Sequence, residues 1–162
     1  MKKNDVIMGM LRYSSYDIVL QEIPNEVSLS FTITGCGLRC IGCHSEYLWD
    51  KNNGEELTDE LFVSLIKKYE GMISCVLFMG GEWHLEELLN KIKFVNEIGL
   101  KTALYTGLND RQIERKTPQL LTELNYLKTG RWSERLGGLN QPTTNQKLRN
   151  LKTGEILNHL FK

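Results

Sequence analysis

The sequence lacks an excess of charge of either sign, and it lacks long apolar runs. Its 20 lysines and arginines balance 20 aspartates and glutamates, so the formal net charge at pH 7 is zero. Nucleic-acid-binding proteins usually carry a basic excess or a basic stripe. The longest apolar run, ISCVLFM, is far shorter than the roughly 20 residues that a membrane-spanning helix requires. We therefore expect no nucleic acid and no membrane among the partners.

The sequence also lacks an N-terminal apolar signal segment, internal repeats and low-complexity tracts. Asp5 and Arg12 interrupt the apolar residues of the N-terminus, MKKNDVIMGMLRY, so we expect no signal peptide and a cytoplasmic location. The length of 162 residues, with 41% hydrophobic and 25% charged residues, suits a single folded domain over residues 1–162.

Cysteine is scarce, but its distribution is uneven. Three of the four cysteines lie within the stretch TGCGLRCIGCH, and the fourth, Cys75, lies in an apolar segment. In a reducing compartment, a tight cysteine cluster indicates metal binding or redox chemistry rather than disulfides. Cys75 is expected to be a small buried hydrophobic residue.

Strand and helix patterns alternate along the chain with short connections. Residues 26–34 alternate apolar and polar side chains, whereas residues 72–79 are almost continuously apolar, as in a strand buried on both faces. Strands are predicted at 26–34, 72–79, 101–106 and 123–130, and helices at 58–71, 84–99 and 109–116. This alternation predicts an α/β fold with a mostly parallel sheet.

The pattern weakens beyond Gly130. Residues 131–146 are expected to form a structured loop, and residues 147–162 either a hairpin around Thr153 and Gly154 or a short helix.

Three distinctive segments each follow a predicted strand. These are the cysteine loop, the stretch GGEW at 80–83 and the stretch YTG at 105–107. Right-handed crossovers place the carboxyl ends of parallel strands on one edge of the sheet, where ligand sites in such folds lie. We therefore expect the three segments to lie together.

The cysteine spacing is C-x3-C-x2-C, for which there are three candidate kinds of site. A dinucleotide-binding turn requires a third glycine where Cys40 stands. Structural zinc normally takes four protein ligands, and His44 is poorly placed to join an ion bound by its neighbour Cys43. A [4Fe–4S] cluster held by three thiolates has one iron without a protein ligand, and that iron is open to a substrate or cofactor. The cluster is the favoured alternative and zinc the remaining one.

These residues resemble the radical S-adenosylmethionine (SAM) superfamily, in which such a cysteine triad precedes a GGE turn. The closer resemblance is to the activating proteins of anaerobic (class III) ribonucleotide reductase. It rests on CIGCH, Trp49, YTG, a TGRW-like turn and a TTNQ-like stretch, and it extends from about residue 16 to the C-terminus. Trp83 stands where proline is common after GGE.

The resemblance implies a partial, open (β/α) barrel and two cofactors, a [4Fe–4S] cluster and SAM. It implies that three irons are bound by Cys36, Cys40 and Cys43. It implies that Gly80, Gly81 and Glu82 receive the methionine ammonium of SAM. It implies further cofactor contacts for Gly42, His44, Tyr105, Thr106 and Gly107. No side chain is expected to act as an acid or base, because the chemistry belongs to the cofactors.

The implied function is that of an oxidoreductase. Reductive cleavage of SAM yields methionine and a 5′-deoxyadenosyl radical, which abstracts hydrogen from a glycine of the large reductase subunit. The implied electron donor is a flavodoxin-like protein, and a homodimer is an alternative to a monomer. Two other functions remain open: activation of a different glycyl-radical enzyme, and a non-enzymatic zinc-binding interaction module. No role is assigned to Trp49, Asn145, Gln146 or the C-terminal tail.

Overall fold

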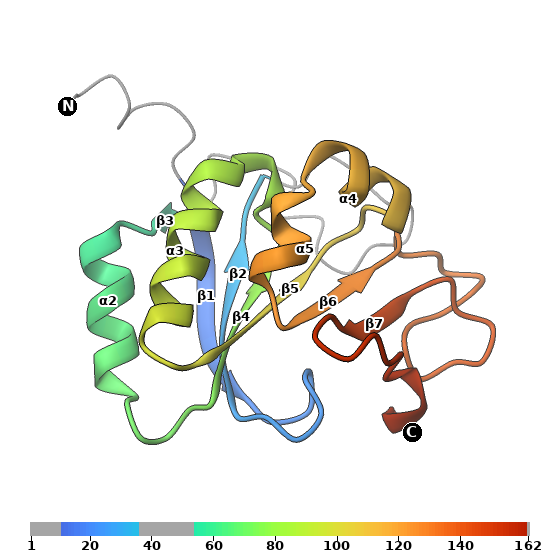
Figure 1. Ribbon diagram of the computed structural model, residues 1–162, viewed down its shortest axis with the longest axis horizontal. Coiled ribbons are helices and arrows are strands. Elements are labelled where there is room, and N and C mark those ends of the chain that lie inside the picture. The colour runs from blue at the N-terminus through green and yellow to red at the C-terminus, as the bar shows by residue number, and fades with distance from the viewer. Residues whose placement is uncertain (1–10, 36–53, 162) are drawn as a thin grey trace.

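The computed structural model describes residues 11–35 and 54–161 (Figure 1). The strands are β1 (Arg12–Val19), β2 (Ser28–Ile33), β3 (Glu55–Glu56), β4 (Cys75–Met79), β5 (Lys101–Tyr105), β6 (Tyr126–Thr129) and β7 (Lys147–Asn150). The helices are α2 (Asp59–Lys68), α3 (Leu85–Glu97), α4 (Asp110–Lys116) and α5 (Gln119–Glu123), with short 3-10 helices at Glu82–His84 and Asn158–Leu160. No helix within these two ranges is long and apolar enough to cross a membrane.

The seven strands form one sheet in the order β3-β1-β2-β4-β5-β6-β7. The central strands β2, β4, β5 and β6 are parallel, whereas β1, β3 and β7 pair antiparallel at the two sides. Strands β3 and β7 stand at the ends of this order, so the described sheet is open. The fold is therefore α/β with a parallel centre, as the alternating pattern predicted.

The helices cover one face of the sheet (Figure 1). Phe31 of β2 and Phe78 of β4 pack with Phe62 of α2, and the aliphatic residues of α3, α4 and α5 complete this main core. A smaller core on the opposite face contains Leu77 of β4 and Leu148 of β7. The carboxyl ends of the central parallel strands lie together at one edge of the sheet.

Local signals explain the boundaries of the predicted elements. The Thr58 hydroxyl accepts a hydrogen bond from the Leu61 amide at 3.1 Å and so begins α2. Asn109 and Gln112 form a capping box at the start of α4. The C-terminal segment forms a turn closed by a bridge between Arg149 and Ile156, which agrees with the hairpin alternative.

Strands β1 and β3 and helix α5 were not predicted. Strand β1, with the sequence RYSSYDIV, has a mixed series of half-buried and exposed side chains rather than a regular alternation. Its pairing with β2 and with the two-residue strand β3 is made by backbone groups, which leave no periodic signal in the sequence.

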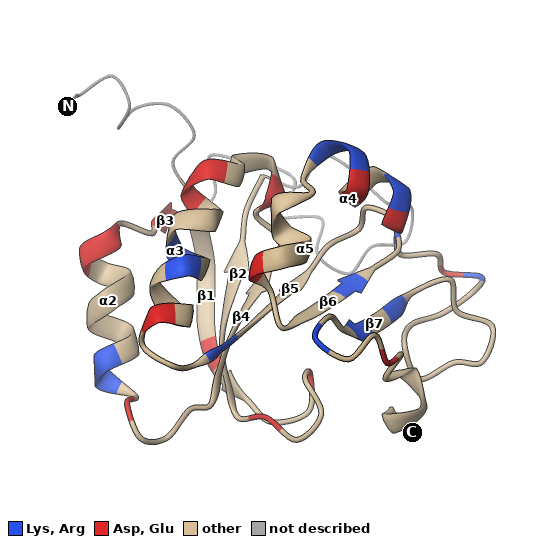
Figure 2. Ribbon diagram, viewed as in Figure 1, with Lys and Arg blue, Asp and Glu red and all other residues tan. Residues whose placement is uncertain are grey.

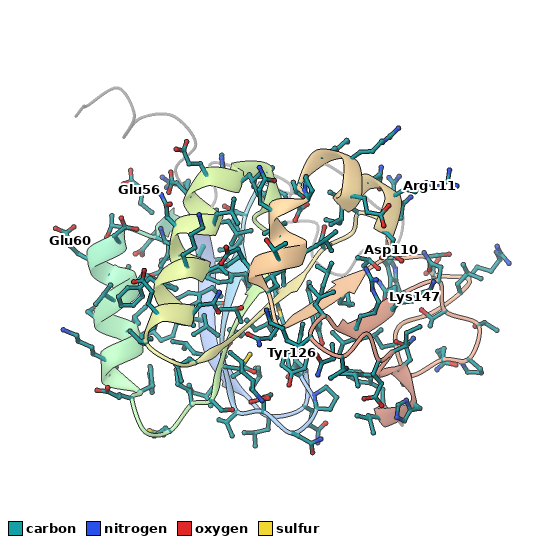
Figure 3. All side chains as sticks on the ribbon, viewed as in Figure 1. Glu56, Glu60, Asp110, Arg111, Tyr126 and Lys147 are labelled. Atoms are coloured by element: carbon teal, nitrogen blue, oxygen red, sulfur yellow. The ribbon has the colours of Figure 1, made fainter. Side chains whose placement is uncertain are left out.

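Charged residues are spread over most elements (Figure 2). Basic residues recur on α4, β6 and β7, and acidic residues occur at the starts of α2 and α3. Asp110, Arg111 and Lys147 lie close together at the end of the molecule formed by α4 and β7 (Figure 3).

Candidate cofactor site at the carboxyl edge of the sheet

Backbone hydrogen bonds hold the turns after β4, β5 and β6 side by side. The Gly80 amide donates to the Tyr105 carbonyl, and the Thr106 amide donates to the Lys128 carbonyl, each at 2.9 Å. Because these turns extend the parallel ladder, the segments GGEW and YTG lie next to each other at the carboxyl edge. Thr34 and Gly35, at the start of the cysteine loop, follow β2 at the same edge.

The turn after β4 depends on two consecutive glycines. Gly80 and Gly81 have φ angles of +95° and +116°, a conformation that side-chain-bearing residues rarely adopt. This conformation lets the chain leave β4 and enter the 3-10 helix at once. The turn thus places the half-buried Gly80 and the buried Gly81 beside the buried Glu82 at the sheet edge.

Glu82 is a buried carboxyl group in this turn. The residue is 8% exposed, and its Oε1 atom has no hydrogen-bond partner among the described residues. Burial raises the pKa of Glu82 to about 7, although hydrogen bonds from its own backbone and from the Thr106 hydroxyl oppose the rise. A buried, incompletely paired carboxyl group is suited to a cationic ligand.

The Thr106 hydroxyl has two hydrogen-bond partners within the protein. Its hydroxyl hydrogen-bonds to Glu82 and accepts the Leu108 amide at 3.1 Å. The side chain is 3% exposed. Thr106 therefore lies beside Glu82 and favours its charged form, and its predicted contact with a cofactor stays a prediction.

Tyr105 points to the face of the sheet opposite the helices. Its hydroxyl donates to the Glu22 carbonyl, and its ring lies 4.7 Å from the Lys128 ammonium. Burial raises the pKa of the Tyr105 hydroxyl, so the phenol stays neutral at physiological pH. These contacts give Tyr105 a structural role; its predicted cofactor contact also stays a prediction.

The stretch TTNQ, for which sequence reasoning found no role, folds back on the turn after β6. The Gln146 side-chain amide donates to the Gly130 carbonyl at 3.2 Å, and the Asn145 amide donates to the Arg131 carbonyl at 3.1 Å. Asn158 in turn donates to the Gln146 carbonyl at 2.8 Å. No periodic pattern signals such contacts, because they join irregular segments that are 12 to 16 residues apart.

Gly130→Ala is expected to lower the free energy of unfolding by about 3 kcal/mol. Gly130 has a φ of +114°, and a Cβ atom there would lie 2.9 Å from both the Asn145 carbonyl oxygen and the Gln146 Cα. Denaturant unfolding measures the change. Gly154→Ala is the matched control, because Gly154 has a φ of +81° with nothing within 4 Å of its added Cβ. Equal losses for the two variants would contradict the close approach at Gly130.

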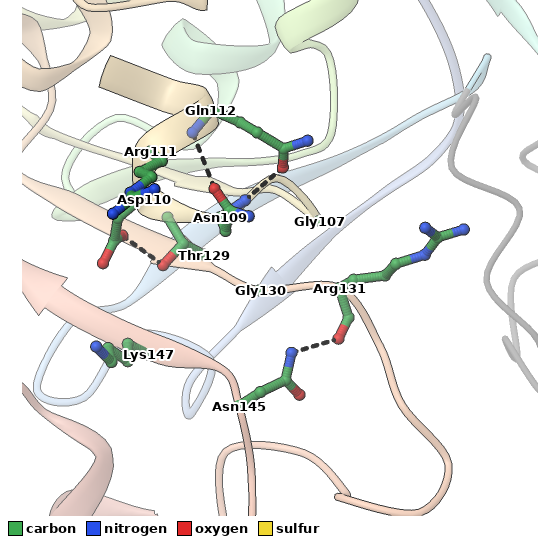
Figure 4. Close-up of a pocket in the computed structure, with 10 residues that line it drawn as sticks. All are labelled: Gly107, Asn109, Asp110, Arg111, Gln112, Thr129, Gly130, Arg131, Asn145 and Lys147. Carbon is green, nitrogen blue, oxygen red and sulfur yellow. Dashed lines mark hydrogen bonds between the residues drawn. The ribbon is translucent and has the colours of Figure 1, made fainter. Parts of the chain in front are cut away.

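A polar hollow of about 520 Å³ adjoins this turn (Figure 4). It is lined by Gly107, Asn109, Asp110, Arg111, Gln112, Thr129, Gly130, Arg131, Asn145 and Lys147. The Asp110 carboxylate accepts hydrogen bonds from Thr129 at 2.8 Å and from Arg149 at 3.1 Å. Asp110 of α4 therefore connects this helix to β6 and β7 at the hollow. Among these lining residues, Gly107 is the predicted site residue, and Asn145 is a residue to which the sequence assigns no role.

The predicted cluster ligands Cys36, Cys40 and Cys43 lie outside the described residues, as do Gly42, His44 and Trp49. Within the described ranges, no group of three His, Cys, Asp or Glu residues is arranged to hold a metal ion. Cys75 is fully buried in β4, and burial raises the pKa of its thiol to about 12. Its thiol therefore stays protonated, and the assignment of the cluster to the other three cysteines stays a prediction.

Comparison with known proteins places the chain in a family. The model of the 4Fe-4S single cluster domain family matches residues 26–152, and the chain belongs to this family. The chain is 31% identical over 103 residues to the pyruvate formate-lyase-activating enzyme of Clostridium pasteurianum; the match covers 57% of this chain and 43% of that protein. It is 33% identical over 82 residues to the 7-carboxy-7-deazaguanine synthase of Hyperthermus butylicus, covering 49% and 34% of the two chains. No solved structure matches the chain significantly.

These matches support membership of the radical SAM superfamily and an iron–sulfur cluster as cofactor. The matched segments span less than half the length of either curated relative. The family match includes the cysteine triad, the GGEW turn and the YTG turn, so the segments singled out in the sequence belong to the shared domain.

Proposed function

We propose that this chain is a radical SAM activating enzyme that generates a glycyl radical on the large subunit of anaerobic ribonucleotide reductase. Membership of a 4Fe-4S family supports the cluster, and the similarity to an activating enzyme supports the reaction class. The observation that carries the proposal is the buried Glu82 carboxyl, at the same sheet edge as the start of the cysteine loop; its Oε1 has no hydrogen-bond partner among residues 11–35 and 54–161.

The residues present fit the proposed cofactors. Cys36, Cys40 and Cys43 would hold the cluster, and the Glu82 carboxylate with the Gly80 and Gly81 backbone would receive the methionine ammonium of SAM. Reduced cluster and SAM together supply one-electron cleavage and hydrogen abstraction. The protein binds and orients SAM and excludes water from the reacting groups. Glu82 supplies the negative charge that a cationic ligand requires, in surroundings where the charge is otherwise costly.

The architecture suits a large substrate. We propose that residues 1–162 act as one domain with the form of a partial, open barrel, with its helices outside and its site at the carboxyl ends of the strands. The order β3 to β7 leaves the described sheet open, which would admit a glycine-containing loop of the reductase. A flavodoxin-like protein would supply the electron.

Anaerobic reconstitution with iron and sulfide, followed by SAM and a strong reductant, tests the reaction. We expect 5′-deoxyadenosine from the wild type and at least a thousandfold less after Cys36→Ala, Cys40→Ala or Cys43→Ala, because the chemistry requires the cluster. Cys75→Ala is the matched control and should retain the activity, since its thiol is buried and protonated. Equal damage by Cys75→Ala would contradict the ligand assignment. A colourless protein with bound zinc would favour the interaction module.

A second candidate function is activation of pyruvate formate-lyase, which the similarity to its activating enzyme favours. Parallel reactions with each large protein separate the two candidates. We expect a glycine-centred electron spin resonance signal with the anaerobic reductase and none with pyruvate formate-lyase. The reverse result would replace the reductase by the lyase.

A further inference from the structure

Trp83 connects the two segments on which the proposed site depends. Its indole Nε1 donates a hydrogen bond of 3.1 Å to the Thr34 carbonyl, 49 positions earlier in the chain. Trp83 directly follows Glu82, and Thr34 is one residue short of the end of the described segment that leads to the predicted cluster ligands. We propose that Trp83 is a positioning residue that fixes the turn of Gly80 to Glu82 relative to the start of the cysteine loop. This inference rests on the proposed function.

The indole ring of Trp83 lies so close to Gly80 that a side chain at position 80 would clash with it. A Cβ atom on Gly80 would lie 2.8 Å from the Cη2 atom of Trp83, closer than non-bonded carbon atoms approach. The partly buried Trp83 side chain also packs against the main core. Its ring therefore contacts both the turn and the core, and its N–H donates to Thr34. Gly80 therefore serves the tether as well as the turn.

Thr34 is a firm anchor for this contact. The residue is 2% exposed, and its amide donates to the Arg12 carbonyl of β1 at 2.9 Å. Its hydroxyl also donates to this carbonyl at 3.3 Å. A buried carbonyl requires a hydrogen-bond partner, and Trp83 supplies it where β2 has ended. Loss of the indole N–H would remove this partner of the Thr34 carbonyl and free the end of β2 from the turn.

Trp83→Phe tests the tether, because it removes the donor and keeps an aromatic ring. Tyr126→Phe is the matched control: it removes an aromatic donor that bonds Glu26 at 2.7 Å at the opposite edge of the sheet. Amide hydrogen exchange at Thr34 and Gly35 is measured in the full chain without cofactors. The SAM dissociation constant is measured by equilibrium dialysis of the reconstituted protein, together with its iron content.

We expect Trp83→Phe to accelerate exchange at Thr34 and Gly35 and to weaken SAM binding, each about tenfold, as the loss of one buried hydrogen bond implies. Iron content should be unchanged, and Tyr126→Phe should alter neither quantity. Wild-type values of both quantities in Trp83→Phe overturn the proposal. Weaker SAM binding without faster exchange also overturns it, because the ring would then act without Thr34. Faster exchange with unchanged SAM binding also overturns the proposal, because the contact between Trp83 and Thr34 would then exist without affecting the SAM site.

Two further results keep the test decisive. If Trp83→Phe does not fold, two other variants replace it. Trp83→His keeps a ring N–H donor, so it should fold and show slower amide exchange at Thr34 than Trp83→Ala. Equal exchange rates in these two variants overturn the proposed hydrogen bond between Trp83 and Thr34. If the wild type binds no SAM, the proposed function and the positioning role both fail. The exchange comparison, which uses no cofactor, then still decides whether the contact exists.

Discussion

Glu82→Gln is expected to weaken SAM binding about 30- to 100-fold at pH 8, because it removes the negative charge that would pair with the methionine ammonium. Hydrogen bonds to charged groups contribute about 1.5–3 kcal/mol, and leaving a buried charge of the ligand unpaired adds to the loss. Equilibrium dialysis at several pH values measures the effect. The wild type should lose affinity as the pH falls through about 7, where Glu82 becomes protonated. The variant should not show this dependence.

The same substitution should have the opposite effect on the stability of the cofactor-free protein. The pKa of Glu82 rises from 4.5 in the unfolded chain to about 7 in the folded one, so protonation stabilises the fold. That stabilisation is fully present below pH 4.5 and is lost as the pH rises through 7. The shift corresponds to roughly 3 kcal/mol. We therefore expect the unfolding free energy of Glu82→Gln, relative to wild type, to increase by about 2–3 kcal/mol between pH 5 and pH 8.

Glu86→Gln is the matched control for both measurements. Glu86 is an exposed residue in the first turn of α3, close to Glu82 in the chain. Its substitution should change SAM affinity less than twofold and stability by no more than about 0.5 kcal/mol. A Glu82→Gln variant that binds SAM like the wild type would contradict a ligand role for the carboxylate. A variant whose stability relative to the wild type does not increase as the pH rises would contradict the raised pKa of Glu82.

The sequence predicted the central strands because their composition reflects their burial. The apolar run at 72–79 contains β4, whose first four residues are buried, and the capping residue Thr58 marked the start of α2. Strand β1 escaped prediction because its side chains are only partly buried and its partners are set by backbone pairing. The parallel centre could be predicted, but the antiparallel sides could not.

The sequence motifs located part of the candidate site, but they did not predict the hydrogen bonds or the pKa values of its residues. The GGE stretch singled out Glu82, but no sequence feature indicates that its Oε1 has no partner in the described part of the chain or that Thr106 bonds to the carboxyl group. The contact of Trp83 with Thr34 spans 49 positions and depends on how two turns meet in space. Such properties arise from tertiary packing, which local patterns do not encode.

A second buried glutamate, Glu26, lies near the opposite, amino edge of the sheet and is fully paired. Its carboxylate accepts hydrogen bonds from the Ser74 hydroxyl at 2.7 Å, the Tyr126 hydroxyl at 2.7 Å and the Lys101 ammonium at 2.9 Å. Burial alone would raise the pKa of Glu26, but these three donors outweigh it and lower the pKa below 4.5. The two edges thus shift the pKa of a buried glutamate in opposite directions: the amino edge stabilises the charge of Glu26, whereas burial at the carboxyl edge disfavours the charge of Glu82.

Glu26→Ala is accordingly expected to lower the free energy of unfolding by about 3 kcal/mol at pH 7, because it leaves three donors from three segments without their acceptor. Denaturant unfolding measures the loss. Since the pKa of Glu26 is lowered by folding, its contribution is present above pH 4.5 and is lost as the pH falls through the folded-state pKa. The stability difference between Glu26→Ala and the wild type should therefore become smaller at acidic pH. The stability difference between Glu82→Gln and the wild type should instead become larger toward alkaline pH. Glu97→Ala, at an exposed position of α3, should change stability by less than about 0.5 kcal/mol. A pH-independent loss in Glu26→Ala would mean that the charge of Glu26 contributes nothing, and the contrast between the two edges would then be wrong.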